Sequence, residues 1–566
     1  MPKEELKAIL LVLLLAAGLR FAGITFDSLW LDEAYQTLAS SVGQRLPDFT
    51  RLGDQAFLFH FGPPRPVNEL LANFRQVDPL CPPLYPVLLN RWMALFGQSD
   101  LSVRSLSAVV SLLSIGAVYW CARLAFGARA ALLSALLQAV SPFDIHYAQE
   151  ARMYSLTVLL STLSCGTFLV LLRSARLAGR TTIALGGYAV STWALINSHY
   201  TALFIPLFQG LFGTVYCLKN RYWRLLGVLG VAWAAVLALW LPWFEMFRQA
   251  AAVRKGTFYV ARSPSWSWPI YSLLIRLPLN WLVFLAGKKV VAYAVPIYLT
   301  SASLLALAAT AILPGGLNRL AGRPSAPRAP DGPASSGLET SVPAVSPERG
   351  CALETSFIGC WALLPALFVW LTDVIENHRV IEIARYVSAT APAIYVLAGA
   401  GLAAVLSRSG SVGATGNGLH EQPSGARGGA SRSAVCSMAL CILLLHVLFA
   451  LVNNAYAHVV PQREPWREMA AQVESLCAAD DPILVSQYYD IVCLDRYLRQ
   501  PRIQIGISPA QGNEHIARLI GSRPRFWLLT AQEGEEAREL IPAGYRPTRE
   551  VHLSHGLHLR LYELAH

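Results

Sequence analysis

The sequence predicts a polytopic α-helical membrane protein that carries a small α/β domain at its C-terminal end. Of its 566 residues, 54% are hydrophobic and only 14% are charged, whereas soluble proteins carry about 25% charged residues. The mean hydropathy is +0.42. Apolar runs of roughly 20 residues recur along the chain between short basic loops, and a helix of that length spans the hydrocarbon core of a bilayer.

From these runs we expect about eleven transmembrane helices within residues 1–452. Their expected limits are close to 8–24, 103–122, 130–145, 153–172, 182–198, 200–218, 225–244, 290–313, 355–372, 387–406 and 434–452. The first run lacks a small-residue cleavage site, so we interpret it as an uncleaved span. Lys and Arg fall in alternate loops, which predicts a cytoplasmic N-terminus and, after an odd number of spans, an extracytoplasmic C-terminus.

Several connections between the expected spans have a distinct character. The first outer loop, residues 25–101, is too long for a simple connection and contains an apolar stretch, 84–96, which we expect to form a helix on the membrane surface. A later outer loop, about 245–289, is rich in Trp, Pro and basic residues, which fits an interfacial aromatic belt or a flap over a site. Residues 314–354 and 407–433 are rich in Gly, Pro, Ser and Arg and are expected to form flexible cytoplasmic loops.

The composition changes after residue 452, and residues 453–566 are predicted to form a soluble α/β domain large enough to bury its own core. The apolar patterns predict helices over 465–476 and 490–498 and strands over 483–486, 525–529 and 551–561. Cys477 and Cys493 lie in this domain, on the oxidising side of the membrane in the expected topology. A disulfide and two free thiols are equally compatible with the sequence.

An acidic pair, Asp32 and Glu33, follows the first apolar run in the stretch SLWLDEAYQTLAS. Carboxylates beside a membrane are costly unless a cavity hydrates them or chemistry uses them, although a solvated helix N-terminus would also favour them. A second acidic site, Glu150 in HYAQEARMY, lies on the same outer face in the expected topology. Together they indicate one polar cavity with aromatic walls. Its candidate lining residues are Trp30, Tyr35, Tyr85, His146, Tyr147, Tyr154 and His199, although a lone histidine such as His199 is more often a satisfied polar group than a ligand.

Basic residues on the outer face are the second informative group, because loops on that side are normally poor in Lys and Arg. The exceptions are Arg20, Arg104, Arg152, Arg254, Lys255, Lys288, Lys289, Arg379 and Arg385. Arg20 and Arg104, near the ends of spans, fit ion pairs as well as they fit contacts to a substrate. Arg152 fits an ion pair with a neighbouring acid, and Lys288 and Lys289 fit snorkelling at the interface.

Several motifs resemble the polyprenyl-phosphate-dependent glycosyltransferases of the C-type fold. They are LWLDEAY, DPLCPPLYPVL with FGQSDLSVRSLSA, HYAQEARMYSL, RYVSATAPAIYVLAGAGL and PQREPWREMAAQVE. The similarity covers most of the first 220 residues and returns in the last two motifs. Within this group the chain resembles the bacterial relatives of protein O-mannosyltransferases and of the transferases that place aminoarabinose on lipid A. Related sequences usually have histidine where this chain has Cys81, which implies a different substrate contact there.

The resemblance implies that a sugar moves from a polyprenyl-phosphate donor to an acceptor hydroxyl with inversion. It implies Asp32 as the general base, with Glu33 and Glu150 completing the catalytic pocket. The leaving phosphate requires fixed cations, and Arg385 with Tyr386 matches the Arg-Tyr element of these transferases. Further candidate ligands of the phosphate are Arg152, Lys288 and Lys289.

The resemblance leaves the acceptor open between a protein, lipid A or its core saccharide, and a cell-envelope glycan. It places the chain in a bacterial inner membrane. No metal ligands are predicted, although some of these transferases use a divalent metal ion and others do not. Nucleic acid is not an expected partner, because no basic run interleaves with aromatic residues, and the net charge of +11 suits cytoplasmic loops facing anionic lipid.

Two other functional classes remain as alternatives. A transporter or flippase of lipid-linked saccharides would carry its charges in the middle of spans and often shows internal repeats, whereas the acids here cluster in outer loops. A non-catalytic glycan-binding subunit would keep the fold and tolerate the loss of Asp32.

Overall fold

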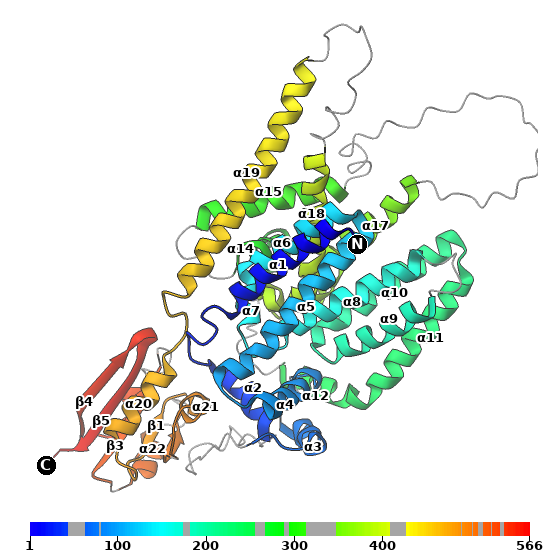
Figure 1. The fold of residues 1–566 in the computed structure, drawn as a ribbon. Helices are drawn as coiled ribbons and strands as arrows, with labels where there is room; N and C mark the ends of the chain where they lie inside the picture. The colour runs from blue at the N-terminus through cyan, green and yellow to red at the C-terminus, as the bar shows by residue number, and fades with distance from the viewer. Residues whose placement is uncertain are drawn as a thin grey trace, which may run out of the picture. The chain divides into compact units, whose positions relative to one another are not determined.

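The computed structural model describes thirteen stretches of the chain, which Figure 1 shows as coloured ribbon. They are residues 1–42, 63–77, 81–173, 181–254, 266–287, 294–312, 347–407, 426–487, 489–500, 502–507, 513–521, 523–531 and 537–565. The chain divides into two compact units. Unit 1 comprises Met1–Arg20, Ala108–Ala148 and Met153–Ala455, and unit 2 comprises Phe21–Ser107, Gln149–Arg152 and Tyr456–His566.

Unit 1 is built from α-helices. They are α1 (Lys3–Phe21), α5 (Asp100–Phe126, which begins in unit 2), α6 (Ala128–Val140), α7 (Pro142–Ala148), α8 (Tyr154–Arg173), α9 (Thr181–Ile196), α10 (Phe204–Asn220), α11 (Trp223–Trp240), α12 (Phe244–Arg254), α13 (Trp268–Tyr271), α14 (Leu277–Ala286), α15 (Ala294–Ile312), α17 (Pro347–Glu376), α18 (Ala391–Leu406) and α19 (Ala426–Ala457, which ends in unit 2). Shorter helical turns are η3 (Tyr200–Leu203), η4 (Leu241–Trp243), η6 (Ser272–Arg276), η7 (Val380–Glu382) and η8 (Ala384–Thr390).

Helix α18 is the centre of this unit. It packs against α6, α15 and α17, and all of its residues except Ala404 and Leu406 are buried. Its alanines and glycines allow neighbouring backbones to approach closely. At Gly399 an added Cβ would lie 2.7 Å from the backbone nitrogen of Ser134 and 2.8 Å from the carbonyl oxygen of Ala130. In Figure 1 helices α8, α9, α10 and α11 run beside one another, in agreement with their pairwise packing.

Unit 1 confirms the prediction of a multi-pass membrane protein. By length and composition, eight helices in the described part of the chain could cross a membrane: Asp100–Phe126, Tyr154–Arg173, Tyr200–Asn220, Trp223–Gln249, Trp268–Ala286, Ala352–Glu376, Ala384–Leu406 and Ala434–Ala457. Three shorter apolar helices, Ala128–Val140, Thr182–Ile196 and Val295–Leu307, also coincide with expected spans. Helix α1 is not among these eight helices, because it carries charged residues at both ends. The total of eleven spans, and the sidedness that follows from it, stay predictions.

The segment Trp268–Ala286 differs from the prediction, which placed residues 245–289 in an outer loop. It is one helical segment, in which the π-helical turn η6 joins α13 to α14. Its prolines led us to expect a loop, but Pro269 lies in the first turn of α13, where a missing N–H costs nothing, and Pro278 lies two residues after the π-helical turn η6, an irregularity at which a helix tolerates proline. Trp268 is buried, and its indole N–H donates to Glu382 over 2.8 Å.

Unit 2 combines three helices from the first long loop with the C-terminal part of the chain. The loop helices are α2 (Leu31–Val42), α3 (Val67–Val77) and α4 (Leu84–Phe96), and α2 packs on both others. Helix α4 has the limits that the sequence predicted. A separate domain beginning at residue 453 stays a prediction. Most of the expected loops 314–354 and 407–433 lies outside the described residues.

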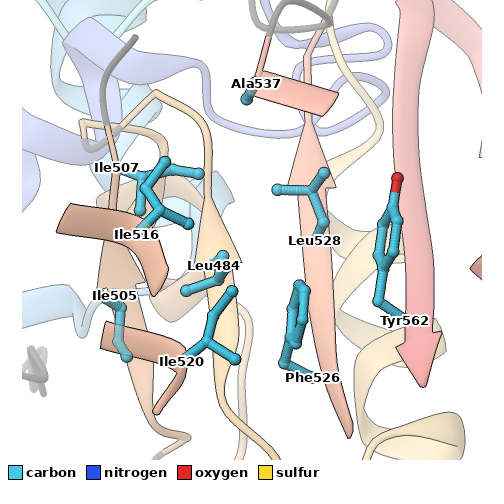
Figure 2. Packing of buried hydrophobic residues seen from close by; sticks show 9 residues of the cluster. All are labelled: Leu484, Ile505, Ile507, Ile516, Ile520, Phe526, Leu528, Ala537 and Tyr562. Atoms are coloured by element: carbon cyan, nitrogen blue, oxygen red, sulfur yellow. The ribbon is translucent and has the colours of Figure 1, made fainter. Parts of the chain in front are cut away.

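The C-terminal part contains a five-stranded mixed sheet with the strand order β2-β1-β3-β5-β4. Its strands are β1 (Ile483–Val485), β2 (Gln504–Gly506), β3 (Arg525–Thr530), β4 (Tyr545–Leu553) and β5 (Leu557–Leu564), and its helices are α20 (Trp466–Leu476), α21 (Asp490–Asp495) and α22 (Asn513–Ile520). Strand β1 is parallel to β2 and β3, and β5 is antiparallel to β3 and β4. Figure 2 shows Ile516 and Ile520 of α22 packed against Leu484, Phe526 and Leu528 of the sheet.

Two predictions for this part require comment. The single strand expected over residues 551–561 is wrong, because the chain turns at Ser554–Gly556 and forms the β4–β5 hairpin. His555 and Gly556 adopt positive φ angles of 60° and 68° there, which the apolar pattern on either side concealed. Of the two alternatives for Cys477 and Cys493, the structure shows free thiols, both buried. Burial raises the pKa of the Cys477 thiol to about 12, so it is protonated at neutral pH.

The C-terminal core yields a stability prediction. Phe526 is fully buried and stacks on Tyr562 with ring centroids 5.4 Å apart. We expect F526A to lose about 3–5 kcal/mol of stability through lost burial and the cavity left behind. Hydrogen exchange of the β3 and β5 amides in the detergent-solubilised full chain should speed up accordingly. The exposed Arg546, changed to Ala, should leave these rates unaltered, and equal rates in the two variants would contradict the core assignment.

Candidate functional site

The first turn of α2 separates the two adjacent carboxylates. The carbonyl oxygen of Trp30 accepts hydrogen bonds from the backbone N–H groups of Glu33 and Ala34, each 2.9 Å long. Consecutive residues on a helix point in different directions. The Asp32 side chain therefore remains 28% exposed, whereas that of Glu33 is fully buried. Both acids are favoured at a helix N-terminus by the backbone dipole, but only Asp32 is accessible.

Glu33 is held by two guanidinium groups and one backbone amide. Arg104 donates to both of its oxygens, from Nε over 2.8 Å and from Nη2 over 2.7 Å. The N–H of Ala151 donates over 2.8 Å, and Arg463 donates from Nη1. Burial by itself would raise the pKa of Glu33, but Arg104 and Arg463 outweigh it and hold the pKa well below the usual value. Glu33 is therefore ionised, and its contacts suit holding α2 in place rather than accepting a proton from a substrate.

Glu150 lies beside this ion pair and shares Arg463 with it. Its Oε1 accepts a hydrogen bond of 3.2 Å from the indole N–H of Trp30, and its Oε2 lies 3.7 Å from Nη2 of Arg463. The guanidinium carbon of Arg463 lies 5.4 Å from the centre of the Trp30 ring, within the range of a cation–π contact. The Glu150 side chain is 1% exposed, so this carboxylate is also sequestered.

Asp32 pairs more loosely, with Arg152. Nη2 of Arg152 lies 3.8 Å from the Asp32 carboxylate, and Nη1 donates to the Asp32 carbonyl oxygen over 3.4 Å. The structure thus shows the ion pair that the sequence offered as an alternative to phosphate binding by Arg152. We call Asp32, Glu33 and Glu150, with Arg104, Arg152 and Arg463, the acidic cluster. All six belong to unit 2.

The remaining candidates in unit 2 surround this cluster. Tyr35 is half-buried on α2. The Tyr85 hydroxyl is buried and lies 2.8 Å from the hydroxyl of Ser107, which donates to the carbonyl oxygen of Arg152. Cys81, at the position where relatives usually have histidine, is buried, and its thiol donates to Oε1 of Gln36 over 3.4 Å. The cysteine therefore contacts the buried face of α2.

A second cluster, in unit 1, gathers the other predicted residues around Arg385. The guanidinium carbon of Arg385 lies 5.6 Å from the ring centre of Tyr154 and 5.4 Å from that of Tyr386. The His199 ring lies 5.9 Å from Tyr154 and 5.6 Å from Tyr386. Tyr147 packs against Tyr154 at 4.9 Å, and His146 packs against Tyr147 at 4.9 Å. We call this set the Arg385 cluster.

His199 has a local structural role in this cluster. Its Nδ1 accepts a hydrogen bond from the backbone N–H of Thr201 and lies 2.7 Å from the Thr201 hydroxyl. That hydroxyl donates in turn to the carbonyl oxygen of Tyr386 over 2.7 Å. His199 therefore caps η3 and ties it to the chain beside Arg385.

Two further arginines belong to elements packed near η8, which carries Arg385. Arg276 ends the π-helical turn η6, and Arg379 precedes η7; η6 packs on η7, and η7 packs on η8. The Nε atoms of both arginines are buried, and no hydrogen-bond partner is found for them among the described residues. Buried guanidinium nitrogens with no protein acceptor suit an anionic ligand.

Sequence reasoning missed Arg463 and Arg276 as site residues. Arg463 lies in PQREPWREMAAQVE, a motif already noted for its resemblance, so that motif contained the signal. Arg276 lay in the segment assigned to a loop. Lys288 and Lys289, the other predicted phosphate ligands, lie outside the described residues. Within the described stretches, no group of three or more His, Cys, Asp or Glu side chains is arranged to hold a metal ion.

The buried Glu33 ion pair predicts a pH-dependent stability. Because the pKa of Glu33 falls below its ordinary value of 4.5 on folding, the ion pair stabilises the fold fully above that pH and progressively less below it. We expect E33Q to leave a buried charge unpaired and lose about 3–5 kcal/mol near neutral pH. The difference in thermal midpoint from the wild type should shrink as the pH falls below 4.5. The matched change of the exposed Glu245 to Gln should have little effect, and a difference that does not vary with pH would refute the ion pair.

Comparisons with known proteins place this geometry in a fold class. Residues 81–243 match the family model described as dolichyl-phosphate-mannose-protein mannosyltransferase. The crystal structure of ArnT from Cupriavidus metallidurans in the apo state is similar over 98% of this chain and 97% of its own, with a TM-score of 0.55 and 15% identity. The structure of the same protein bound to undecaprenyl phosphate has a TM-score of 0.51 and 16% identity over the same shares.

A third similar structure is the archaeal oligosaccharyltransferase AglB from Archaeoglobus fulgidus, in complex with an inhibitory peptide and a dolichol-phosphate. It matches 95% of this chain and 71% of its own, with a TM-score of 0.51 and 13% identity. No curated protein sequence matches the chain. The chain therefore has the C-type glycosyltransferase fold of ArnT and AglB, and its residues 81–243 carry the match to the dolichyl-phosphate-mannose-protein mannosyltransferase family.

Proposed function

We propose that this protein is an integral-membrane inverting glycosyltransferase that moves a sugar from a polyprenyl-phosphate donor to an acceptor hydroxyl. The observation that carries the proposal is the selective exposure of Asp32. Of the three carboxylates in the acidic cluster, Glu33 and Glu150 are sequestered by arginines, whereas the Asp32 side chain is 28% exposed. The fold supports the donor class, because one similar structure contains undecaprenyl phosphate and another contains a dolichol-phosphate.

Asp32 is the proposed general base. The acceptor oxygen attacks the anomeric carbon, the carboxylate takes the hydroxyl proton, and the bond to the phosphate oxygen breaks with inversion at that carbon. General-base assistance of this kind contributes about 10²–10⁴-fold to a rate. The partly exposed position of Asp32 permits direct contact with an acceptor, and Arg152 at 3.8 Å orients its carboxylate. Glu33 and Glu150 hold the first turn of α2, which carries Asp32.

The Arg385 cluster is the proposed site for the donor phosphate. The leaving group is a phosphate monoester whose charge grows as the glycosidic bond breaks, and fixed guanidinium groups stabilise such charge. Arg385 lies over the rings of Tyr154 and Tyr386, which pre-organise it. Arg276 and Arg379, with their buried Nε atoms, are proposed as additional ligands. Tyr147 and His146 extend the aromatic surface of Tyr154, on which a sugar ring would stack.

The setting of the reaction follows from the charge pattern. We propose that the N-terminus lies in the cytoplasm of a bacterial inner membrane and that residues 453–566 lie on the outer face, as the alternation of basic loops predicts. The transferred group is a hexosyl or pentosyl residue, and the acceptor is a protein, lipid or glycan of the cell envelope. An exposed Asp32 fits a transferase that binds an acceptor better than it fits a transporter, because the functional charges of a transporter lie within its spans.

The base role has a direct test. D32N keeps the shape of the side chain but removes its ability to take a proton. We expect the rate of sugar transfer from a polyprenyl-phosphate donor to fall by about 10²–10⁴-fold, with the protein level and thermal midpoint unchanged. The matched control changes the exposed Asp480 to Asn and should leave transfer intact. Near-normal turnover in D32N would eliminate the base role.

The phosphate role is tested through donor affinity. Removing the guanidinium in R385A takes away charge-assisted hydrogen bonds worth about 1.5–3 kcal/mol each, so donor affinity should weaken by roughly 10- to 150-fold. R385K keeps a positive point charge and should recover part of the donor affinity that R385A loses. The exposed Arg248, changed to Ala, serves as the control. Donor affinity in R385A equal to that of the wild type would remove Arg385 from the site.

A further inference from the structure

We propose that residues 462–467, which precede and begin α20, position the first turn of α2 that carries Asp32, and that Arg463 is the positioning residue. This inference rests on the proposed function, because it concerns how Asp32 is held for transfer. Arg463 contacts Glu33, Glu150 and the Trp30 ring at once. Its side chain is only 12% exposed, so it is a built part of the acidic cluster rather than a surface contact.

The charges of the cluster explain why this arginine matters. Three carboxylates face three guanidinium groups: Arg104 pairs with Glu33, Arg152 lies beside Asp32, and Arg463 bridges Glu33 and Glu150. A buried carboxylate that loses its counter-charge binds a proton more readily or moves toward water. Without Arg463, Glu33 would retain Arg104 and the Ala151 amide, whereas Glu150 would lose its contact to the Arg463 guanidinium.

The effect reaches Asp32 through Trp30. The Trp30 ring lies beneath Arg463, and its indole N–H donates to Glu150. Its carbonyl oxygen accepts the N–H groups of Glu33 and Ala34 and so fixes the first turn of α2. Asp32 lies within that turn. A displacement of about 1 Å in a positioning group can cost roughly 10²-fold in rate, so the Arg463–Trp30 contact is a sensitive point.

Hydrogen bonds on either side of Arg463 join residues 462–467 to residues 25–28, which lead to Trp30. The N–H of Gln462 donates to the Asp27 carboxylate over 3.1 Å, and the N–H of Arg467 donates to the Ser28 hydroxyl over 3.1 Å. Nη2 of Arg467 donates to the carbonyl oxygens of Thr25 and Asp27, over 2.8 and 2.9 Å. The loop before α2 is therefore bonded to residues 462–467 through both backbone and side chains.

Asp100, at the start of α5, anchors the same elements. It accepts hydrogen bonds from Arg467 over 3.0 Å, Arg496 over 3.2 Å and the Tyr497 hydroxyl over 2.7 Å. That hydroxyl accepts in turn from the N–H of Leu29 over 2.7 Å. Tyr497, which follows α21, thus holds Leu29, the residue that directly precedes Trp30. The C-terminal part of the chain is an integral support of the acidic cluster.

The test compares R463M, R463K and the control R499M, each in the full chain in membranes. Arg499 lies in the same part of the chain, and its side chain is 90% exposed. We expect R463M to lower kcat for sugar transfer by about 10- to 100-fold, with KM for the donor changed less than about 3-fold. The acid limb of its pH–rate profile should move to higher pH, because the acidic cluster then has one counter-charge fewer and its carboxylates bind protons more readily. R463K should restore the acid limb but only part of kcat, and R499M should match the wild type.

A second comparison separates positioning from general damage. In the double variant R463M/E150Q the surplus negative charge is removed together with the arginine. The loss of thermal midpoint should therefore be smaller than the sum of the two single losses, as for directly coupled residues. Additive losses, or an R463M profile with its acid limb in the wild-type position, would overturn the positioning role. A wild type that transfers no sugar would refute the proposed function instead, and the thermal coupling would still test the Arg463 contact.

Discussion

The buried carboxylate of Glu33 is the constraint on which the rest of the acidic cluster depends. A charge removed from water is tolerated only when partners replace its hydration, and Glu33 recruits them from distant parts of the sequence. Arg104 comes from the start of a transmembrane helix, Ala151 from the turn after α7, and Arg463 from the C-terminal part of the chain. Pairing the charge of this one carboxylate therefore brings three segments around the first turn of α2, which carries Asp32.

This arrangement assigns different chemistry to carboxylates that the sequence alone cannot distinguish. Environment decides whether a carboxyl group holds structure or takes part in proton transfer. Glu33 and Glu150 accept hydrogen bonds or ion pairs from arginines, an amide and an indole, whereas the Asp32 side chain stays partly exposed and lies 3.8 Å from Arg152. The difference arises from helix geometry, because neighbouring residues in the first turn of α2 face in different directions.

Much of the architecture could be predicted because hydrophobic length and periodicity report it directly. The apolar runs gave the multi-pass helical class, and residues 84–96 gave α4 with its limits. The errors have local causes. Prolines in first turns concealed the helical segment Trp268–Ala286, and a tight turn at His555 divided an apparently continuous strand. Arg463 could not be assigned from spacing, since its partners lie more than 300 residues away in the chain. Only tertiary structure reveals such a contact.

The proposed function assigns complementary chemistry to two clusters, an acid for the acceptor in the acidic cluster and arginines for the donor phosphate in the Arg385 cluster. Its central claim is that the chain breaks the bond between sugar and lipid phosphate. The most direct test places the purified chain in proteoliposomes with a labelled sugar on polyprenyl phosphate and an envelope extract as acceptor, followed by mass spectrometry. The account predicts free polyprenyl phosphate and a labelled acceptor with inverted anomeric configuration. Intact donor that has merely crossed to the other leaflet would contradict it.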